Sequence, residues 1–411
     1  MQKHDARKLS VLLMAAFIDM VGYAMVFPLL PFYAVRMGGG AQIVGWLVAA
    51  FSIAQVASSP LWGRFSDRWG RRPGLLISLG GSAVAFVIFG FATSLWLLFL
   101  SRLVQGASGG TSGVMQAYVA DTVPPEGRAE ALGWLSAATS AGVMIGPALG
   151  SLSWWLGPEA PGLLAAALCV INLAFAWRWL PESRRGDFES GAEPLATGVP
   201  IETVPDPAHR QTHQSLTTML WETLRYPTKE TSELIWIYTV GMMAFSALTA
   251  VLTLFLMERF HVRESNIGYI FVFLGMLSVV MRAGVLGRLV KALGEVRVIQ
   301  LGAVLLMIGF ATYPWPQRFS VMIFVMALVP IGTALLFPST TALLSRRGHK
   351  EQLGQLMGVQ HAFGGASRIV GPLWAGAAFQ YLGPAAPFYA AAAIVGVAAL
   401  LSGRLRREAR T

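Results

Sequence analysis

Twelve apolar runs of roughly 20 residues constrain the fold of this chain more than any other feature. A helix of that length crosses the roughly 30 Å hydrocarbon core of a bilayer. Apolar residues make up 55% of the chain and charged residues only 13%, about half the charged share of soluble domains. The first apolar stretch runs from Leu9 to about Tyr33, too long for a signal peptide. The runs lie near residues 9–33, 41–62, 74–93, 95–120, 130–156, 161–180, 234–257, 266–286, 297–315, 319–344, 353–380 and 385–403. The sequence therefore predicts an all-α integral membrane protein with twelve transmembrane helices.

The basic residues predict the orientation of these helices. An even number of spans places both termini on the same side of the membrane. With that side in the cytoplasm, the inner segments hold 23 of the 31 Lys and Arg residues and the outer loops hold four. The positive-inside rule thus predicts a multi-pass protein of the inner (plasma) membrane, embedded in the lipid bilayer, with both termini cytoplasmic. Because topology accounts for the net charge of +10, no nucleic-acid partner is expected.

The chain repeats itself on either side of a polar segment. Four landmarks recur with an offset of 224 or 225 residues: Gly63 as Gly287, Gly70 as Gly294, Gly133 as Gly358, and Gly146-Pro147 as Gly371-Pro372. The constant offset predicts two pseudo-symmetric six-helix halves, residues 1–182 and 233–411, joined by a Pro- and Glu-rich cytoplasmic linker at 183–232. Two parallel halves of this kind describe a transporter architecture with its site between them, near the midplane.

Several motifs resemble those of the major facilitator superfamily. "GRFSDRWGRRP" (63–73), between the second and third predicted helices, is similar to its loop 2–3 signature. "FIDMVGYAMVFPLLPFY" (17–33), "RLVQGASGG" (102–110) and "GVMIGPALGS" (142–151) resemble helices 1, 4 and 5 of its twelve-helix drug:proton antiporters, which include the tetracycline exporters. The resemblance implies the major facilitator fold and a proton-coupled secondary transporter that exports small amphipathic molecules or drugs by alternating access. A proton symporter or facilitator for an organic anion, metabolite or lipid-like substrate is the alternative. A monomer is expected.

The charged cluster at 60–73 is interpreted as a topology anchor and a conformational gate. Asp67 can accept hydrogen bonds from the free N–H groups at the start of another helix, which the resemblance places near Gly354. Arg71 or Arg72 can pair with Asp121, at the inner end of helix 4. Such pairs would hold the inner side shut in one state and separate in the other. The expected gate residues are Gly63, Asp67, Arg68, Gly70, Arg71, Arg72 and Asp121. Positive-inside anchoring alone is the alternative, but it explains only the arginines.

Gly142, Gly146 and Gly150 recur every four residues and therefore share one helix face. Small residues on one face permit close helix–helix contact, and Pro147 can bend the helix. The resemblance identifies this set as the antiporter motif of helix 5, which favours efflux over uptake. Generic packing is the alternative.

Asp19 is the predicted proton-coupling residue. It lies about 16 Å into the first helix at 1.5 Å per residue, and a carboxylate at that depth is costly unless it is paired or protonated. A permanently paired structural charge is the alternative. The resemblance links the helix 4 arginine, Arg102, to proton exchange, so Arg102 is expected to be the partner or modulator of Asp19.

The candidate substrate-binding residues lie on predicted spans. They are Tyr23, Phe27, Trp46, Gln105, Gln116, Phe245, Arg282, Gln360, His361 and Arg368. Arg282 could instead snorkel to the membrane surface, and His361 could be a packing residue. Because the intramembrane arginines outnumber the one mid-span carboxylate, the sequence suggests anionic or zwitterionic cargo. Tetracycline exporters carry a further acid in helix 9, whereas "VIQLGAVLLMIGFATY" has none, which counts against tetracycline itself as cargo.

The sequence does not indicate an enzyme. "GASGG" (106–110) fits Gly-x-Ser-x-Gly, but it lies inside an apolar helix, where Ser108 cannot form a nucleophile elbow. The zinc-protease pattern His-Glu-x-x-His and the phosphate-binding P-loop are both missing from the sequence. With Cys169 as the single cysteine, an internal disulfide is excluded. No metal and no cofactor are expected, and the predicted partners are a small-molecule substrate and protons.

Overall fold

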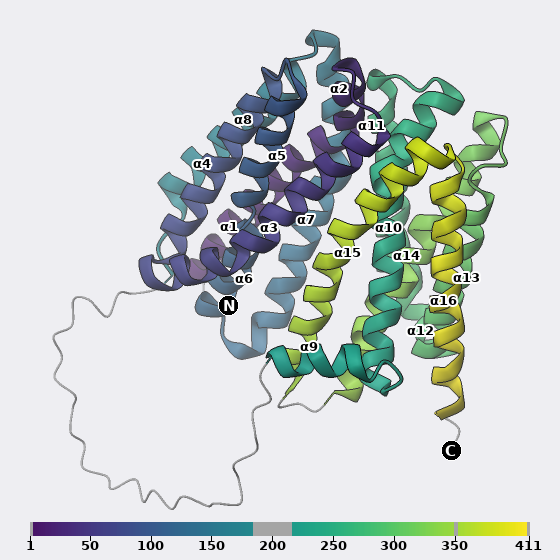
Figure 1. Ribbon diagram of the computed structural model, residues 1–411. Helices are drawn as coiled ribbons and strands as arrows, with labels where there is room; N and C mark the ends of the chain where they lie inside the picture. Colours follow the sequence, from purple (N-terminus) through teal and green to yellow (C-terminus); the bar gives the residue numbers. More distant parts are fainter. Residues whose placement is uncertain (1–2, 184–215, 349–351, 409–411) are drawn as a thin grey trace, which may run out of the picture.

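The computed structural model describes residues 3–183, 216–348 and 352–408, which form helices without any strand (Figure 1). The N-terminal half contains α1 (Lys3–Val26), the 3-10 turn η1 (Phe27–Leu29), α2 (Leu30–Arg36), α3 (Ala41–Trp69), α4 (Arg71–Gly90), α5 (Leu95–Ala107), α6 (Thr111–Thr122), α7 (Pro125–Ser153), the 3-10 turn η2 (Trp154–Leu156) and α8 (Ala160–Trp179). The C-terminal half contains α10 (Glu230–Phe260), α11 (Glu264–Val280), the π-helical turn η4 (Met281–Val285), α12 (Leu286–Leu293), α13 (Glu295–Thr312), α14 (Phe319–Arg347), α15 (Leu353–Leu382) and α16 (Ala386–Glu408). Helix α9 (Leu216–Arg225) precedes the C-terminal half.

These helices make twelve membrane crossings. Within the described ranges, ten helical segments are each long and apolar enough to span a bilayer. The other two crossings are α5 with α6, which are interrupted at residues 108–110, and α15, which carries Gln360, His361 and Arg368. The predicted fold class, an all-α membrane protein of two six-helix halves, is therefore confirmed.

The internal repeat reappears in the backbone at Gly70 and Gly294. Gly70 separates α3 from α4 with φ of 101° and ψ of 158°, and Gly294 separates α12 from α13 with φ of 79° and ψ of 158°. A positive φ is accessible to glycine without strain, so a single residue is enough to reverse the chain direction here. The predicted inner loop at 63–73 is consequently much shorter than expected, because helix continues to Trp69 and resumes at Arg71.

The predicted linker at 183–232 is only partly described, since residues 184–215 lie outside the described ranges. Its described part contains the helix α9. Met219 and Thr223 of α9 are buried, and the indole N–H of Trp236 on α10 donates to the carbonyl of Thr223 at 3.2 Å. Because α10 begins at Glu230, the C-terminal helices start slightly before the expected boundary at residue 233.

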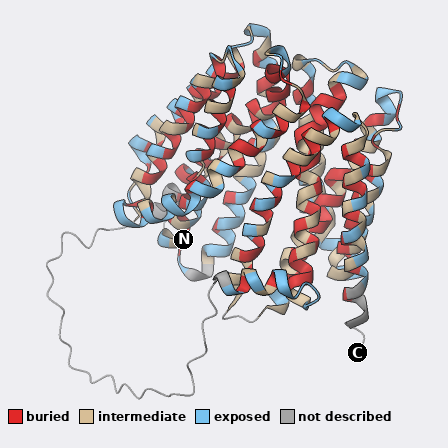
Figure 2. Ribbon diagram, in the orientation of Figure 1, coloured by how far each residue is buried: buried red, intermediate tan, exposed pale blue. Residues whose placement is uncertain are grey.

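The outer surface of the bundle has the distribution expected of a protein in lipid. Figure 2 shows buried residues along the contacts between helices and exposed residues over the outside. Large exposed tryptophans lie near both ends of the bundle, Trp96, Trp155 and Trp315 at one end and Trp69 and Trp177 at the other. Tryptophan favours the two membrane interfaces, so these side chains mark the expected membrane boundaries.

Candidate functional site: a cavity between the two halves

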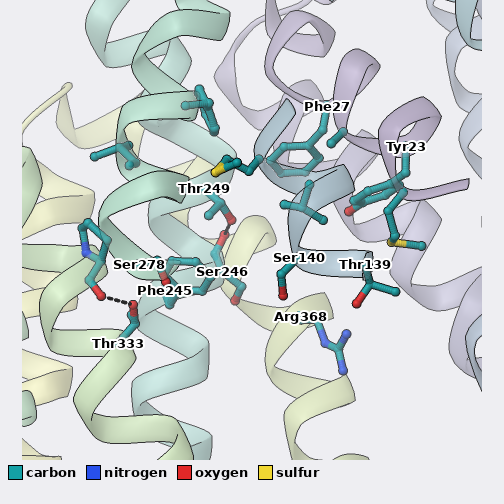
Figure 3. Close-up of a pocket in the computed structure, with 18 of the residues that line it drawn as sticks. Tyr23, Phe27, Thr139, Ser140, Phe245, Ser246, Thr249, Ser278, Thr333 and Arg368 are labelled. Carbon is teal, nitrogen blue, oxygen red and sulfur yellow. Dashed lines mark hydrogen bonds between the residues drawn. The ribbon is translucent and has the colours of Figure 1, made fainter. Parts of the chain in front are cut away.

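A cavity of about 1200 Å³ lies between the two halves (Figure 3). Its walls come from α1, η1, α2, α3, α5, α6 and α7 of the N-terminal half and from α10, α11, η4, α14 and α15 of the C-terminal half. Drug-sized ligands occupy cavities of roughly 300–1,000 Å³, so this one is large enough for such a molecule. We call the side of the bundle that carries both chain ends the terminal side, and the opposite one the far side (Figure 1).

On the far side, α3 of one half packs tightly against α15 of the other. A Cβ on Gly376 would lie 2.6 Å from the Ala41 carbonyl oxygen, which means that the two helices approach at glycine. The Ala41 amide donates to Gln380 Oε1 at 2.8 Å, and the Tyr381 hydroxyl donates to Gln42 Oε1 at 2.9 Å. These contacts join the halves along one edge of the far side.

A second seam joins α7 to α11. The Ser151 hydroxyl donates to the Glu264 carbonyl at 2.6 Å and accepts from the Gly268 amide at 2.8 Å. The Gly268 Cα faces the Pro147 carbonyl so closely that a Cβ would collide with it. Both seams lie on the far side, whereas the lining residues Gln116 and His361 are exposed. The cavity is therefore closed on the far side and open toward the terminal side.

Aromatic side chains supply much of the cavity wall. Tyr23 lies against Phe27 with ring centroids 6.0 Å apart, and against Phe51 at 5.3 Å. In the other half, Phe245 lies edge-to-face with Phe337 at 6.2 Å. Such surfaces stack on the apolar or aromatic body of a ligand.

A stripe of hydroxyl groups on α7 also lines the cavity and was missed by the sequence analysis. Ser136, Thr139 and Ser140 all belong to the lining, and Figure 3 shows Thr139 and Ser140 on the same wall. Their spacing of i, i+3 and i+4 puts them on one helix face. This polar stripe inside an apolar span was the signal available in the sequence.

Most of the predicted substrate residues line this cavity. Those in the lining are Tyr23, Phe27, Gln116, Phe245, Arg282, His361 and Arg368. Three others lie elsewhere. Gln105 and Gln360 are buried outside the lining, with the Gln360 Oε1 accepting from the Thr341 hydroxyl at 3.3 Å, and Trp46 is exposed on the outside of α3.

Asp19 lies outside the cavity lining. It is only 8% exposed and is close enough to Cys169 of α8 to interact with it electrostatically. One turn away, the Cα of Gly22 packs near the Cys169 sulfur, and the Asn172 amide of α8 donates to the Ala15 carbonyl at 2.8 Å. Asp19 therefore lies near the contact between α1 and α8.

Arg102 does not pair with Asp19 in this state, so the expectation that it modulates Asp19 stays a prediction. Arg102 is 2% exposed and lines the cavity, with its guanidinium 5.1 Å from the centre of the Phe89 ring. Its Nε lies 3.4 Å from the Ser101 hydroxyl, and its Nη2 has no hydrogen-bond partner in the described part of the chain. The two residues are on helices of the same half, but their side chains have different neighbours.

The expected gate residues form a network within the N-terminal half. Arg71 Nη1 lies 2.6 Å from Asp67 Oδ1 and donates to the Ser66 hydroxyl at 2.8 Å, while Arg71 Nε donates to Asp121 Oδ2 at 2.8 Å. Arg71 thus ties the end of α3 and the start of α4 to the end of α6. Since these elements belong to one half, the network does not cross the interface in this state.

The neighbouring gate residues also stay within the N-terminal half. The Glu182 carboxylate accepts the backbone N–H groups of Arg71 and Arg72 at 2.8 and 3.0 Å, which caps the start of α4. The Arg72 guanidinium donates to the Trp177 carbonyl, and that of Arg68 lies 5.8 Å from the Trp69 ring centre.

The space around two of the expected contact points is open. A Cβ at Gly63, or at Gly354 near the start of α15, would meet nothing within 4 Å. Among the described residues, Asp67 pairs with Arg71 and remains 60% exposed, and no contact with the start of α15 is present in this state.

The glycines of the predicted antiporter motif lie against the backbone of α1. A Cβ on Gly142 would be 2.5 Å from the Phe17 carbonyl oxygen, and one on Gly146 would be 2.6 Å from that of Val21. Gly150 faces the Met25 carbonyl in the same way. The close helix contact expected at this motif is present, and it fixes α1 against α7 beside the cavity.

The fold and the cavity between its halves are those of a membrane transporter. The chain belongs to the Major Facilitator Superfamily, whose family model matches residues 12–317 and 283–411. The members of this family to which the chain is similar are transporters, and the chain is a transporter rather than an enzyme.

Named relatives extend this comparison. The chain is 31% identical over 375 residues to "Tetracycline resistance protein, class C" of Escherichia coli, covering 89% of this chain and 88% of that one. It is 28% identical over 377 residues to "Multidrug resistance protein 2" of Bacillus subtilis (strain 168), covering 90% and 88%. Among solved structures, the human organic anion transporter MFSD10 (TETRAN) is similar with a TM-score of 0.67 and 22% identity, covering 98% of this chain and all of that one.

Proposed function

We propose that the protein is a proton-coupled exporter of small amphipathic molecules, including drugs, that works by alternating access. The observation that carries this proposal is the cavity of about 1200 Å³ between the halves, closed on one side of the bundle and walled by aromatic and hydroxyl groups. The relatives with tetracycline and multidrug resistance in their names support efflux of such molecules.

The distribution of basic residues supports a cytoplasmic position for the terminal side, in the inner (plasma) membrane. The state described here is then open to the cytoplasm, where an exporter takes up its cargo. In the opposite state the far-side seams would separate and the terminal side would close. The protein acts in this proposal as a monomer, because one chain supplies both halves of the cavity.

Asp19 is the proposed proton site. Among the described residues it is the one acid in the middle of a membrane-spanning helix, and no cation pairs with it in this state. Burial without a cation favours the protonated carboxyl over the carboxylate. Because Asp19 lies outside the cavity lining, proton and cargo would occupy separate positions, with Arg102, which lines the cavity, as the modulator.

The network around Arg71 is the proposed gate on the terminal side. Asp67 is 60% exposed there, so its carboxylate is accessible to a helix N-terminus of the other half once the halves close. The glycines at 142, 146 and 150 would allow α1 and α7 to keep their close contact through the cycle, which supports their assignment as the antiporter motif.

Transport in proteoliposomes tests the proposal. Purified protein is reconstituted with a pH-sensitive dye inside, and labelled ethidium, 2-naphthylacetate and tetracycline are tried as cargo. Antiport predicts that a proton gradient drives at least one cargo against the direction of proton flow, with the dye reporting proton movement. Movement of cargo and protons in the same direction, or cargo movement that ignores the gradient, would instead establish the symporter or the facilitator.

A further inference from the structure

The charged side chains that line the cavity are basic. Among the described residues, its lining contains Arg102, Arg282, Arg368 and His361 and no aspartate or glutamate. Asp19, the mid-span acid of α1, lies outside the lining. When cations line a pocket whose protein walls have a low dielectric constant, they focus a positive potential on its interior.

Two of the arginines flank one tyrosine in the C-terminal half. The ring of Tyr238 packs over Gly364, where a Cβ would lie 3.1 Å from it, and Arg368 follows one helical turn later with its Nε 3.4 Å from the Gly364 carbonyl. Arg282 and Arg368 both line the cavity and lie within electrostatic range of Tyr238. Three elements, α10, η4 and α15, therefore bring two guanidinium groups and a hydroxyl donor to the same part of the C-terminal half.

Arg282 owes its position to a local irregularity. It lies in η4 (Met281–Val285), a single π-helical turn between α11 and α12. A π turn inserts an extra residue into a helix and changes the direction of the side chains that follow, and such turns are frequent at functional sites.

Arg368 also reaches toward the N-terminal half. Figure 3 shows it extending from α15 on the side of the cavity where Thr139 lies, and both Arg368 and Arg102 act electrostatically on Tyr23. Neither Arg282 nor Arg368 forms an ion pair with another described residue, and the buried Nη2 of Arg102 lacks a partner. The cations of the cavity are thus available to a ligand.

We propose that the cargo is an amphipathic organic anion whose carboxylate or similar oxyanion group binds to Arg368 and Arg282 beside Tyr238. Guanidinium groups bind oxyanions through paired, charge-assisted hydrogen bonds. The aromatic wall formed by Tyr23, Phe27 and Phe51 receives the apolar body of the molecule. This inference rests on the proposed transport function and specifies its substrate class.

Equilibrium binding to the purified full chain tests the charge preference directly. The probes are 2-naphthylacetate, its neutral amide 2-naphthylacetamide and the cation 2-naphthylethylammonium, which share one aromatic body. We expect the anion to bind at least tenfold more tightly than the amide, and the cation to bind most weakly. Binding needs no proton gradient, so this result is independent of whether transport is proton-coupled.

Variants then assign the preference to the two arginines. Arg368→Gln and Arg282→Gln should each reduce affinity for 2-naphthylacetate about tenfold, as expected when a hydrogen bond to a charged group is lost, and leave the amide unchanged. Arg368→Lys keeps the charge and should retain most of the preference. Arg288→Gln is the matched control, since Arg288 is exposed on α12 outside the cavity lining.

The proposal is overturned if the amide or the cation binds as tightly as the anion, if none of the three binds, or if both arginine variants keep the wild-type preference. A transporter that exports a cation against a proton gradient would satisfy the proposed function and still refute this assignment. Conversely, a preference for the anion without proton coupling would support the assignment and refute the antiport mechanism.

Discussion

Arg36 Nη2 and Glu264 Oε1 lie 2.9 Å apart and form an ion pair between the two halves on the far side. Arg36 ends α2, and Glu264 begins α11. Exposed pairs of this kind contribute little to folding, about 0–1 kcal/mol. The Arg36–Glu264 pair matters because it can form only while the far side is closed. Even this small energy therefore affects the balance between the state open on the terminal side and the state open on the far side.

We therefore expect Glu264→Gln to shift the population toward the state that is open on the far side, by up to about fivefold. Distances between spin labels on the far ends of α3 and α15 would report the shift. Arg318→Gln, on an exposed arginine next to α14, is the control. The ion pair has no role in the balance if both variants give the wild-type distance distribution.

Gly268 should be required for closure of the far side. A Cβ on this residue would collide with the Pro147 carbonyl, and overpacking of this kind typically costs 1–3 kcal/mol. Gly268→Ala is thus expected to open the far side and slow the return to the state described here, measured by labelling of a cysteine placed on the cavity wall from the far side.

Gly403→Ala is the matched control for that experiment. Gly403 lies in α16, and a Cβ there would meet nothing within 4 Å. The control should leave labelling unchanged. Equal labelling of the Gly268 and Gly403 variants would show that the α7–α11 seam tolerates a methyl group and does not limit the cycle.

Asp19→Asn should abolish transport driven by a proton gradient and preserve exchange of cargo without a gradient. The amide keeps the shape of the carboxyl group but cannot take up or release a proton. The measurements are gradient-driven flux and counterflow in the same proteoliposomes. Glu130→Gln serves as the control, since Glu130 is an exposed acid on α7. Gradient-driven export at the wild-type rate by Asp19→Asn would exclude Asp19 as the coupling site.

The two acids that pair with Arg71 should differ in their effects. Asp121 links α6 to Arg71 inside one half, so Asp121→Asn is expected to lower the free energy of unfolding by about 1 kcal/mol or less and to change the conformational balance less than Asp67→Asn does. Asp67 is the proposed contact to the other half, so Asp67→Asn should raise the population open on the terminal side. Thermal unfolding and cysteine accessibility, in a Cys169→Ser background, separate these outcomes, and the gate proposal fails if the Asp67 variant shows unchanged accessibility.

The sequence by itself determined the helices, their number and the duplication. Apolar runs long enough to span a bilayer leave the backbone no alternative to helix, because every N–H and C=O must find a partner within the segment. The repeat could also be read from the sequence, because it is carried by glycines at equivalent positions of the two halves. Gly70 and Gly294, which are 224 residues apart in the sequence, adopt positive φ angles at equivalent turns.

Most of the substrate residues predicted from the sequence lie in the cavity lining, because they were chosen as polar or aromatic residues at mid-membrane depth. Tyr23, Phe245 and Arg368 were predicted and lie in the lining. Gln105 and Gln360 satisfy the same criterion and lie outside it. Depth in the membrane can be counted along a helix, but the direction that a side chain faces cannot.

Only the tertiary structure decided the partners of the charged residues. Arg102 and Asp19 lie on helices of the same half, yet Arg102 packs over Phe89 and Asp19 lies near Cys169. In a soluble protein, water on one side of a helix reveals its rotation through alternating polar and apolar residues. A transmembrane helix is apolar on both its lipid and its protein faces, so its rotation is set by the packing of small residues such as Gly142 and Gly146 against α1, and that packing exists only in the folded bundle.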